Sequence, residues 1–78
     1  MFRDSKRPQP GQRYRAVRLD GTLSPVTWEV IELFENEVDG LTYARLRQTD
    51  DRSRIKSVGA VVLADVSQFR PLAEAALG

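Results

Sequence analysis

The sequence contains neither cysteine nor histidine in its 78 residues. Without cysteine, disulfides, thiolate metal sites and a thiol nucleophile are excluded. Without histidine, the usual general base of enzymes and the commonest metal ligand are missing. The chain also has no glycine-rich phosphate loop, so we expect a protein that is not an enzyme and that binds no cofactor and no metal.

Long apolar runs are missing as well. No stretch approaches the roughly 20 apolar residues that a membrane-spanning helix needs. Residues 1–11 carry charges with no hydrophobic stretch behind them, so we expect no secretory signal. Together with the lack of cysteine, this predicts a cytoplasmic protein without a membrane partner.

The composition is that of a small folded domain. A chain of 78 residues fits one domain, near the size at which a single core is barely sufficient. An apolar share of 41% supports such a core, and a charged share of 29% provides a solvated surface.

The net charge is only +1, but the charges are segregated along the chain. The net charge is +4 over residues 1–20, −5 over 21–44, +3 over 45–56 and −1 over the remaining residues. Such segregation indicates either a basic surface or opposite charges that pair across neighbouring strands.

A β-hairpin is the clearest structural signal. Residues 27–34 and 41–48 are rich in residue types that favour strands, and apolar and polar residues partly alternate in them. Asp39-Gly40 lies between the two segments. Asp-Gly is typical of a hairpin turn because glycine accepts the positive φ that such a turn requires. We therefore predict two paired strands at these positions.

The apolar residues of this hairpin have two different phases. If the turn closes at Asp39-Gly40, one face carries Ile31, Leu33, Ala44 and Leu46. Trp28 and Val30 have the opposite phase. Either a bulge between Val30 and Ile31 switches the faces, or Trp28 covers one end of the fold.

Before the hairpin, residues 13–19 predict a first strand, with apolar residues between arginines. Asp20-Gly21 and Ser24-Pro25 then predict a loop, and Pro25 argues against a central strand there.

After the hairpin, residues 54–58 predict a short fourth strand, and residues 66–70 predict a last strand that stops at Pro71. Residues 60–64 fit either an extension of a strand or a single helical turn.

The two ends of the chain differ from its middle. Residues 1–11 are basic and interrupted by proline and glycine, which predicts a flexible tail. Residues 72–78 are good helix formers, but they are too few for a stable isolated helix. The domain is therefore expected over residues 12–71.

Five short strands in so small a chain favour a closed antiparallel barrel over a sandwich. The order of strand, loop with Pro25, hairpin, short strand, turn and last strand resembles that of the SH3-like small barrels, which include Tudor-type and KOW-type modules. The resemblance implies a fold and no particular activity. The expected fold class is all-β, a small five-stranded antiparallel SH3-like barrel with a flexible basic N-terminal tail. The expected core consists of Trp28, Ile31, Leu33, Leu46, Ile55 and Phe69.

Trp28 has two interpretations. In Tudor-type barrels, which this chain resembles, aromatic rings form cages for methylated side chains. Here only Tyr14, Tyr43 and Phe69 are available to join Trp28 in a cage. The alternative is that Trp28 belongs to the core or covers its end.

Arginines alternate with tyrosines on the first and third strands. The candidate nucleic-acid-binding residues are Arg13, Arg15, Tyr43, Arg45 and Arg47. Tyr14 lies among them, and the basic arm of residues 3–7 would add non-specific affinity. Arginines neutralise phosphates while aromatic rings stack on unpaired bases.

The same arginines have a structural interpretation. Glu29 and Glu32 lie on the strand opposite Arg45 and Arg47, and cross-strand pairs of opposite charge stabilise ordinary sheets. Both interpretations stay open at this point.

Other polar residues indicate turns rather than chemistry. The acids Glu35, Glu37, Asp39, Asp50 and Asp51 lack the spacing of a calcium loop. Lys56 and Ser57 are adjacent, but neighbours on a strand point to opposite faces and do not form an activated pair.

Two hypotheses for function follow. The first is a non-catalytic interaction module that pairs with an unidentified protein partner or with a second copy of itself, because a small barrel leaves edge strands available for strand addition. The rival is a nucleic-acid-binding barrel that uses the arginine and tyrosine surface.

Overall fold

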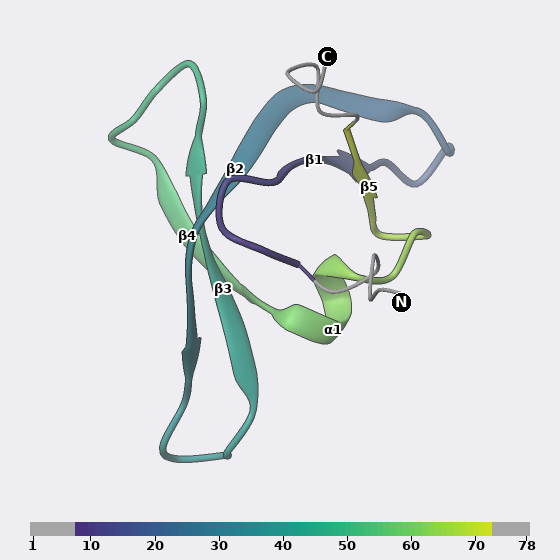
Figure 1. Cartoon of the computed structure of the whole chain (residues 1–78). Coiled ribbons are helices and arrows are strands. Elements are labelled where there is room, and N and C mark those ends of the chain that lie inside the picture. The colour runs from purple at the N-terminus through teal and green to yellow at the C-terminus, as the bar shows by residue number, and fades with distance from the viewer. Residues whose placement is uncertain (1–7, 73–78) are drawn as a thin grey trace, which may run out of the picture.

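The computed structural model describes residues 8–72, which form five strands and one short helix (Figure 1). In chain order these are β1 (Arg13–Val17), β2 (Leu23–Glu35), β3 (Thr42–Gln48), β4 (Ile55–Gly59), α1 (Ala60–Leu63) and β5 (Phe69–Pro71). All five strands join one antiparallel sheet in the order β4-β3-β2-β1-β5. The long β2 bends across the molecule and pairs with β3 on one side and β1 on the other (Figure 1).

The predicted β2–β3 hairpin is confirmed. Gly40 has a φ of 71°, which explains why glycine follows Asp39 in the turn. The Asn36 N–H donates to the Leu41 carbonyl at 2.9 Å, and the Asp39 carboxylate accepts from the Leu41 N–H at 2.9 Å. The turn is therefore held by both backbone and side-chain bonds.

A β-bulge in β2 resolves the two apolar phases. Val30 is paired with Leu46, but Glu32 is paired with the next residue, Arg45, which leaves Ile31 as the extra residue. The bulge returns Leu33 to the face that carries Val30. Of the two alternatives from the sequence, the bulge between Val30 and Ile31 is the correct one.

Pro25 lies inside β2, and the prediction of a loop at this position was wrong. Arg15 pairs with Thr27 but Val17 pairs with Leu23, so β2 carries extra residues around Pro25. Proline is tolerated at such an irregularity because no ladder hydrogen bond is required of its nitrogen. The described pairing with β3 begins only at Trp28, so Pro25 also faces no partner on that side.

The core differs in part from the one predicted. The buried residues are Tyr14, Val30, Ala44, Leu46, Leu63 and Phe69, with Ala16, Trp28, Leu33 and Val58 packed against them. Two core predictions were wrong. Ile31 is only half-buried because it is the bulge residue, and Ile55 is 52% exposed because it lies on the edge strand β4, opposite Arg47 on β3.

The last third of the chain forms a strand, a helical turn and a short strand. Of the two alternatives for residues 60–64, the helical turn is correct, and Leu63 of α1 is fully buried. β5 has three residues and pairs with β1, where Phe69 lies opposite Ala16. β4 and β5 are the two ends of the sheet, and within residues 8–72 no ladder joins them. The sheet is therefore not closed by hydrogen bonds, in contrast to the closed barrel predicted from the sequence.

Both ends of the described chain attach to the sheet. Pro8 is buried, the Gly11 N–H donates to the Val30 carbonyl at 2.8 Å, and the Val30 N–H donates to the Gln12 carbonyl at 2.9 Å. The Leu72 N–H donates to the Arg13 carbonyl at 2.9 Å. Part of the segment predicted to be flexible is thus bonded to β2. The rest of that tail, residues 1–7, and most of the predicted C-terminal helix, residues 73–78, lie outside the described residues.

Candidate functional site

The structure places all five candidate nucleic-acid-binding residues on one face of the sheet, which we call the outer face because it is opposite the core. The cross-strand register aligns Arg13, Glu29, Arg47 and Ile55 in one row. A second row contains Glu32, Arg45 and Ser57, and a third contains Phe34, Tyr43 and Gly59. Basic and acidic residues therefore alternate across the strands.

Most charged groups in these rows are paired within the chain. Arg45 forms an ion pair with Glu32 at 3.1 Å, and its guanidinium lies 4.9 Å from the Phe34 ring centroid. Arg13 lies 3.7 Å from Glu29. The cross-strand interpretation is thus confirmed for Arg45, whereas Glu29, which faces Arg47 in the register, pairs with Arg13 instead.

Tyr43 is also engaged in local contacts. Its ring stacks on Phe34 with centroids 5.8 Å apart, and its hydroxyl donates to the Asp39 carboxylate at 2.8 Å. The hydrogen bond to Asp39 raises the pKa of Tyr43, and the negative charge of Asp39 adds to this effect. Tyr43 therefore serves as a link between the hairpin turn and the outer face.

Among the described residues, two outer-face arginines have no such partner. Within residues 8–72, no carboxylate lies within ion-pair distance of Arg15 or Arg47, although Arg15 donates to the Thr27 hydroxyl at 3.5 Å. Tyr14 is not on this face, because its side chain is buried in the core. This burial raises the pKa of Tyr14. Of the two tyrosines expected to stack on bases beside the arginines, only Tyr43 therefore lies on the outer face.

Of the four aromatic residues considered for a cage, Tyr14, Trp28 and Phe69 lie together at the core, and Tyr43 lies apart from them. Tyr14 and Phe69 are buried, and Tyr43 is on the outer face. Trp28 packs against the core, and Lys56 Nζ lies 4.3 Å from its ring centroid. Lys56 Nζ lies 5.7 Å from the Phe69 ring centroid. The core interpretation of Trp28 is the one that this arrangement supports.

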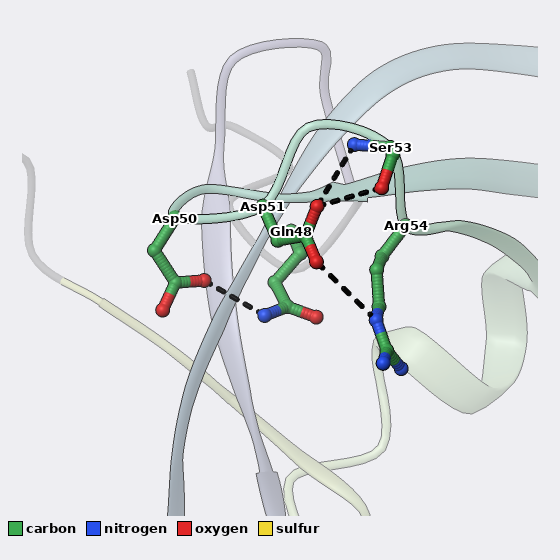
Figure 2. A network of polar contacts seen from close by, with 5 residues as sticks. All are labelled: Gln48, Asp50, Asp51, Ser53 and Arg54. Carbon is green, nitrogen blue, oxygen red and sulfur yellow. Dashed lines mark hydrogen bonds and ion pairs between the residues drawn. The ribbon is translucent and has the colours of Figure 1, made fainter.

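The acidic residues near β4 belong to a tight turn (Figure 2). Asp51 accepts hydrogen bonds from the Ser53 N–H at 3.2 Å and the Ser53 hydroxyl at 2.7 Å, and it forms an ion pair with Arg54 at 3.4 Å. The bonds from Ser53 lower the pKa of Asp51, with a smaller contribution from Arg54. Gln48 donates to Asp50 at 2.7 Å. In residues 8–72 no group of three or more metal-ligating side chains gathers.

The same turn occurs twice more, at Asp-x-Thr and Asp-x-Ser segments. Asp20 accepts from the Thr22 N–H and hydroxyl at 3.0 and 2.7 Å, and Asp65 accepts from the Ser67 N–H and hydroxyl at 2.9 and 2.7 Å. These bonds lower the pKa of both carboxyl groups. The sequence shows this spacing of Asp and a hydroxyl residue two positions later, but the three turns were not predicted from it. Two of the three turns flank the segment that contains β4 and α1.

Within residues 8–72, β4 is an edge strand that pairs with β3 on one side and with no strand on the other. The Gln48 N–H donates to the Arg54 carbonyl at 3.0 Å, which marks these two residues as a hydrogen-bonded pair. Because bonded and non-bonded pairs alternate in an antiparallel ladder, Lys56 also points its backbone groups toward β3. Ile55 and Ser57 therefore direct their N–H and C=O groups away from the sheet.

This edge is accessible and long enough to accept another strand. Ile55, Lys56 and Ser57 are all exposed, and β4 contributes five residues. The opposite edge is β5, which has only three residues and ends at Pro71. Lys56 and Ser57 point to opposite faces, as predicted, since Lys56 covers Trp28 and Ser57 lies opposite Arg45.

Comparison of the chain with protein-family models, with curated proteins and with solved structures gave no match. Among the helices of residues 8–72, none has the length and apolar character to cross a bilayer.

Proposed function

We propose that this protein is a non-catalytic interaction module that binds an extended segment of a protein partner along the free edge of β4. The observation that carries the proposal is the outward direction of the Ile55 and Ser57 backbone groups on an exposed edge strand. An added strand would satisfy these groups with main-chain hydrogen bonds, and pockets beside alternate side chains would supply specificity.

The proposal includes the fold that the sequence suggested. The strand, hairpin, short strand, helical turn and last strand follow the element order that resembles SH3-like small barrels. We retain an SH3-like arrangement as part of the proposal, with the gap between β4 and β5 left open. A cytoplasmic location, which rests on the cysteine-free sequence, belongs to the proposal as well.

Binding of nucleic acid is the second candidate function. Arg15 and Arg47 on the outer face favour it, because no carboxylate within residues 8–72 pairs with them. Against it, Arg13 and Arg45 are already paired with acids, so few charges are free to release counterions from a phosphate backbone. This is why we rank it below strand addition.

One set of titrations separates the two functions. Peptides selected from a random library for binding to the protein are added to the ¹⁵N-labelled chain. We expect shifts of backbone resonances in β4 that disappear in Ser57→Pro, which removes an outward N–H. Labelled single-stranded DNA and RNA are titrated in parallel at low and moderate salt. Binding that weakens steeply with salt and is lost in Arg15→Gln/Arg47→Gln would contradict the proposal and favour nucleic acid.

A further inference from the structure

We infer that the partner strand at the β4 edge is β4 of a second copy of this chain, paired antiparallel about a two-fold axis at Ser57. The inference rests on the proposed function and names its partner. A two-fold interface requires one surface to be complementary to itself. The edge of β4 meets this requirement in its backbone and its side chains.

The backbone alternation fixes the register. Ile55 and Ser57 direct their backbone groups outward, and Gly59 follows at the same spacing of two residues. Centring the pair on Ser57 places Ile55 of one copy opposite Gly59 of the second copy. Outward-facing residues then meet only outward-facing residues, as an antiparallel ladder requires.

The side chains of the outer face fit this register. Ile55 is 52% exposed, so its side chain has apolar surface that a second copy can bury. Gly59 has no side chain, and a Cβ added there would meet only Val62 Cγ2 at 3.8 Å. The Val62 side chain therefore borders the position above Gly59, and Ile55 of the second copy would pack over Gly59 and against Val62.

Tyr43 completes this contact. It is the β3 residue paired with Gly59, so it lies next to the position that Ile55 of the second copy would occupy. An edge glycine covered by a β-branched side chain and an aromatic neighbour is a favourable cross-strand arrangement. The two-fold axis creates this contact twice.

Charge disfavours the neighbouring register that is centred on Lys56. Centring the pair on Lys56 would place the two lysines directly opposite each other, which is destabilising. Centring on Ser57 places each Lys56 opposite Val58 of the second copy. Arg45 lies beside Ser57, but the two copies of Arg45 would be three strand spacings apart, about 14 Å, which exceeds the screening length of about 8 Å.

The short edge limits the affinity. Five residues per copy bury less than the roughly 1,200 Å² of a standard stable interface, so we expect a weak, concentration-dependent dimer. Sedimentation and light scattering from about 10 µM to about 1 mM cover the range in which such a dimer forms.

The test compares three chains. We expect the wild type to shift from monomer toward dimer mass with concentration, and Ser57→Pro to stay monomeric over the same range. The matched control is Ser57→Thr, which keeps the N–H and should dimerise like the wild type. A Ser57→Pro variant that folds and still dimerises would overturn the inference, because another surface would then hold the dimer.

A second measurement does not depend on any variant. In a mixture of ¹⁵N- and ¹³C-labelled wild-type chains, intermolecular nuclear Overhauser effects should connect Ile55 to Tyr43 and Gly59 of the other copy. Dimers without these contacts would overturn the inference even if Ser57→Pro fails to fold.

The result for a monomeric wild type is also informative. A chain that stays monomeric at about 1 mM overturns the self-pairing inference. Binding of the selected peptides then tests whether β4 accepts a strand from a different partner. If they bind at β4, strand addition stands with a different partner, and if none binds there, both statements fail.

Discussion

The outer face of β1–β3 and the free edge of β4 differ in what their polar groups already bind. On the outer face, Arg13 and Arg45 are paired with Glu29 and Glu32. At the edge of β4, Ser57 carries no charge, and its backbone groups point away from β3, the strand that pairs with β4 within residues 8–72. A charged surface in a sequence is therefore not by itself a binding surface. What counts is whether the groups have partners in the fold.

The largest effect should separate the buried centre of the sheet from its edge. Leu46 is completely buried, so we expect Leu46→Ala to lower the free energy of unfolding by about 2–5 kcal/mol. A domain of this size has only about 4–12 kcal/mol in total. Ile55→Ala at the edge is the control and should cost less than about 1 kcal/mol, since 52% of Ile55 is exposed. Urea denaturation measures the free energy of unfolding of both variants. Equal losses of stability would contradict the assignment of Leu46 to the buried centre and of Ile55 to the exposed edge.

That contrast shows which parts of the fold were readable from the sequence. The hairpin was predicted because the Asp39-Gly40 turn and the strand patterns depend only on local chemistry. Leu46 and Phe69 were correctly placed in the core. Ile31 and Ile55 were not, because a bulge and an edge position are set by pairing with other strands.

The remaining differences also come from long-range pairing. Pro25 breaks a regular strand, and only the register shift with β1 makes room for it in β2. Tyr14 appeared in a basic run, but pairing with Trp28 turns it into the core. For the candidate site, the grouping of the arginines and their opposition to Glu29 and Glu32 were predictable from the hairpin register. The outward direction of the Ser57 backbone was not, since it depends on which residues of β4 bond to β3.

The second prediction tests the backbone alternation along β4. Lys56→Pro removes an N–H that faces β3, so we expect a loss of about 1–3 kcal/mol in unfolding free energy. Ser57→Pro removes an N–H that faces outward and should be close to wild type, because proline is tolerated on the free side of an edge strand. Lys56→Ala controls for the loss of the contact with Trp28. If the two proline variants exchange their order of stability, the direction of the edge groups is reversed and the β4 proposals lose their basis.

A smaller effect should appear on the outer face. If internal pairing is what keeps the arginines from binding phosphates, Glu29→Gln/Glu32→Gln should free Arg13 and Arg45. We expect the loss of these exposed pairs to cost less than about 1 kcal/mol in stability. Affinity for single-stranded nucleic acid at low salt should increase several-fold and decrease again as salt is added. Unchanged affinity would show that the acids do not mask this face.

The smallest effect concerns the three Asp turns and their dependence on pH. Hydrogen bonds from Thr22, Ser53 and Ser67 lower the pKa values of Asp20, Asp51 and Asp65 in the folded chain. A carboxyl group with a lowered folded-state pKa stabilises the fold above its unfolded pKa, and this contribution is lost as pH falls through the folded value. Stability should therefore decline below about pH 4, close to the unfolded pKa of Asp.

Asn keeps an oxygen acceptor for these turns but has no carboxyl group to protonate. We expect Asp51→Asn to be slightly less stable than the wild type near pH 7, because it loses the ion pair with Arg54. Its melting temperature should then fall less steeply than that of the wild type between about pH 5 and pH 2, so that the difference between the two chains narrows in acid. Two profiles of melting temperature that keep the same separation at every pH would mean that ionisation of Asp51 contributes nothing to stability, and that an uncharged oxygen acceptor is sufficient for this turn.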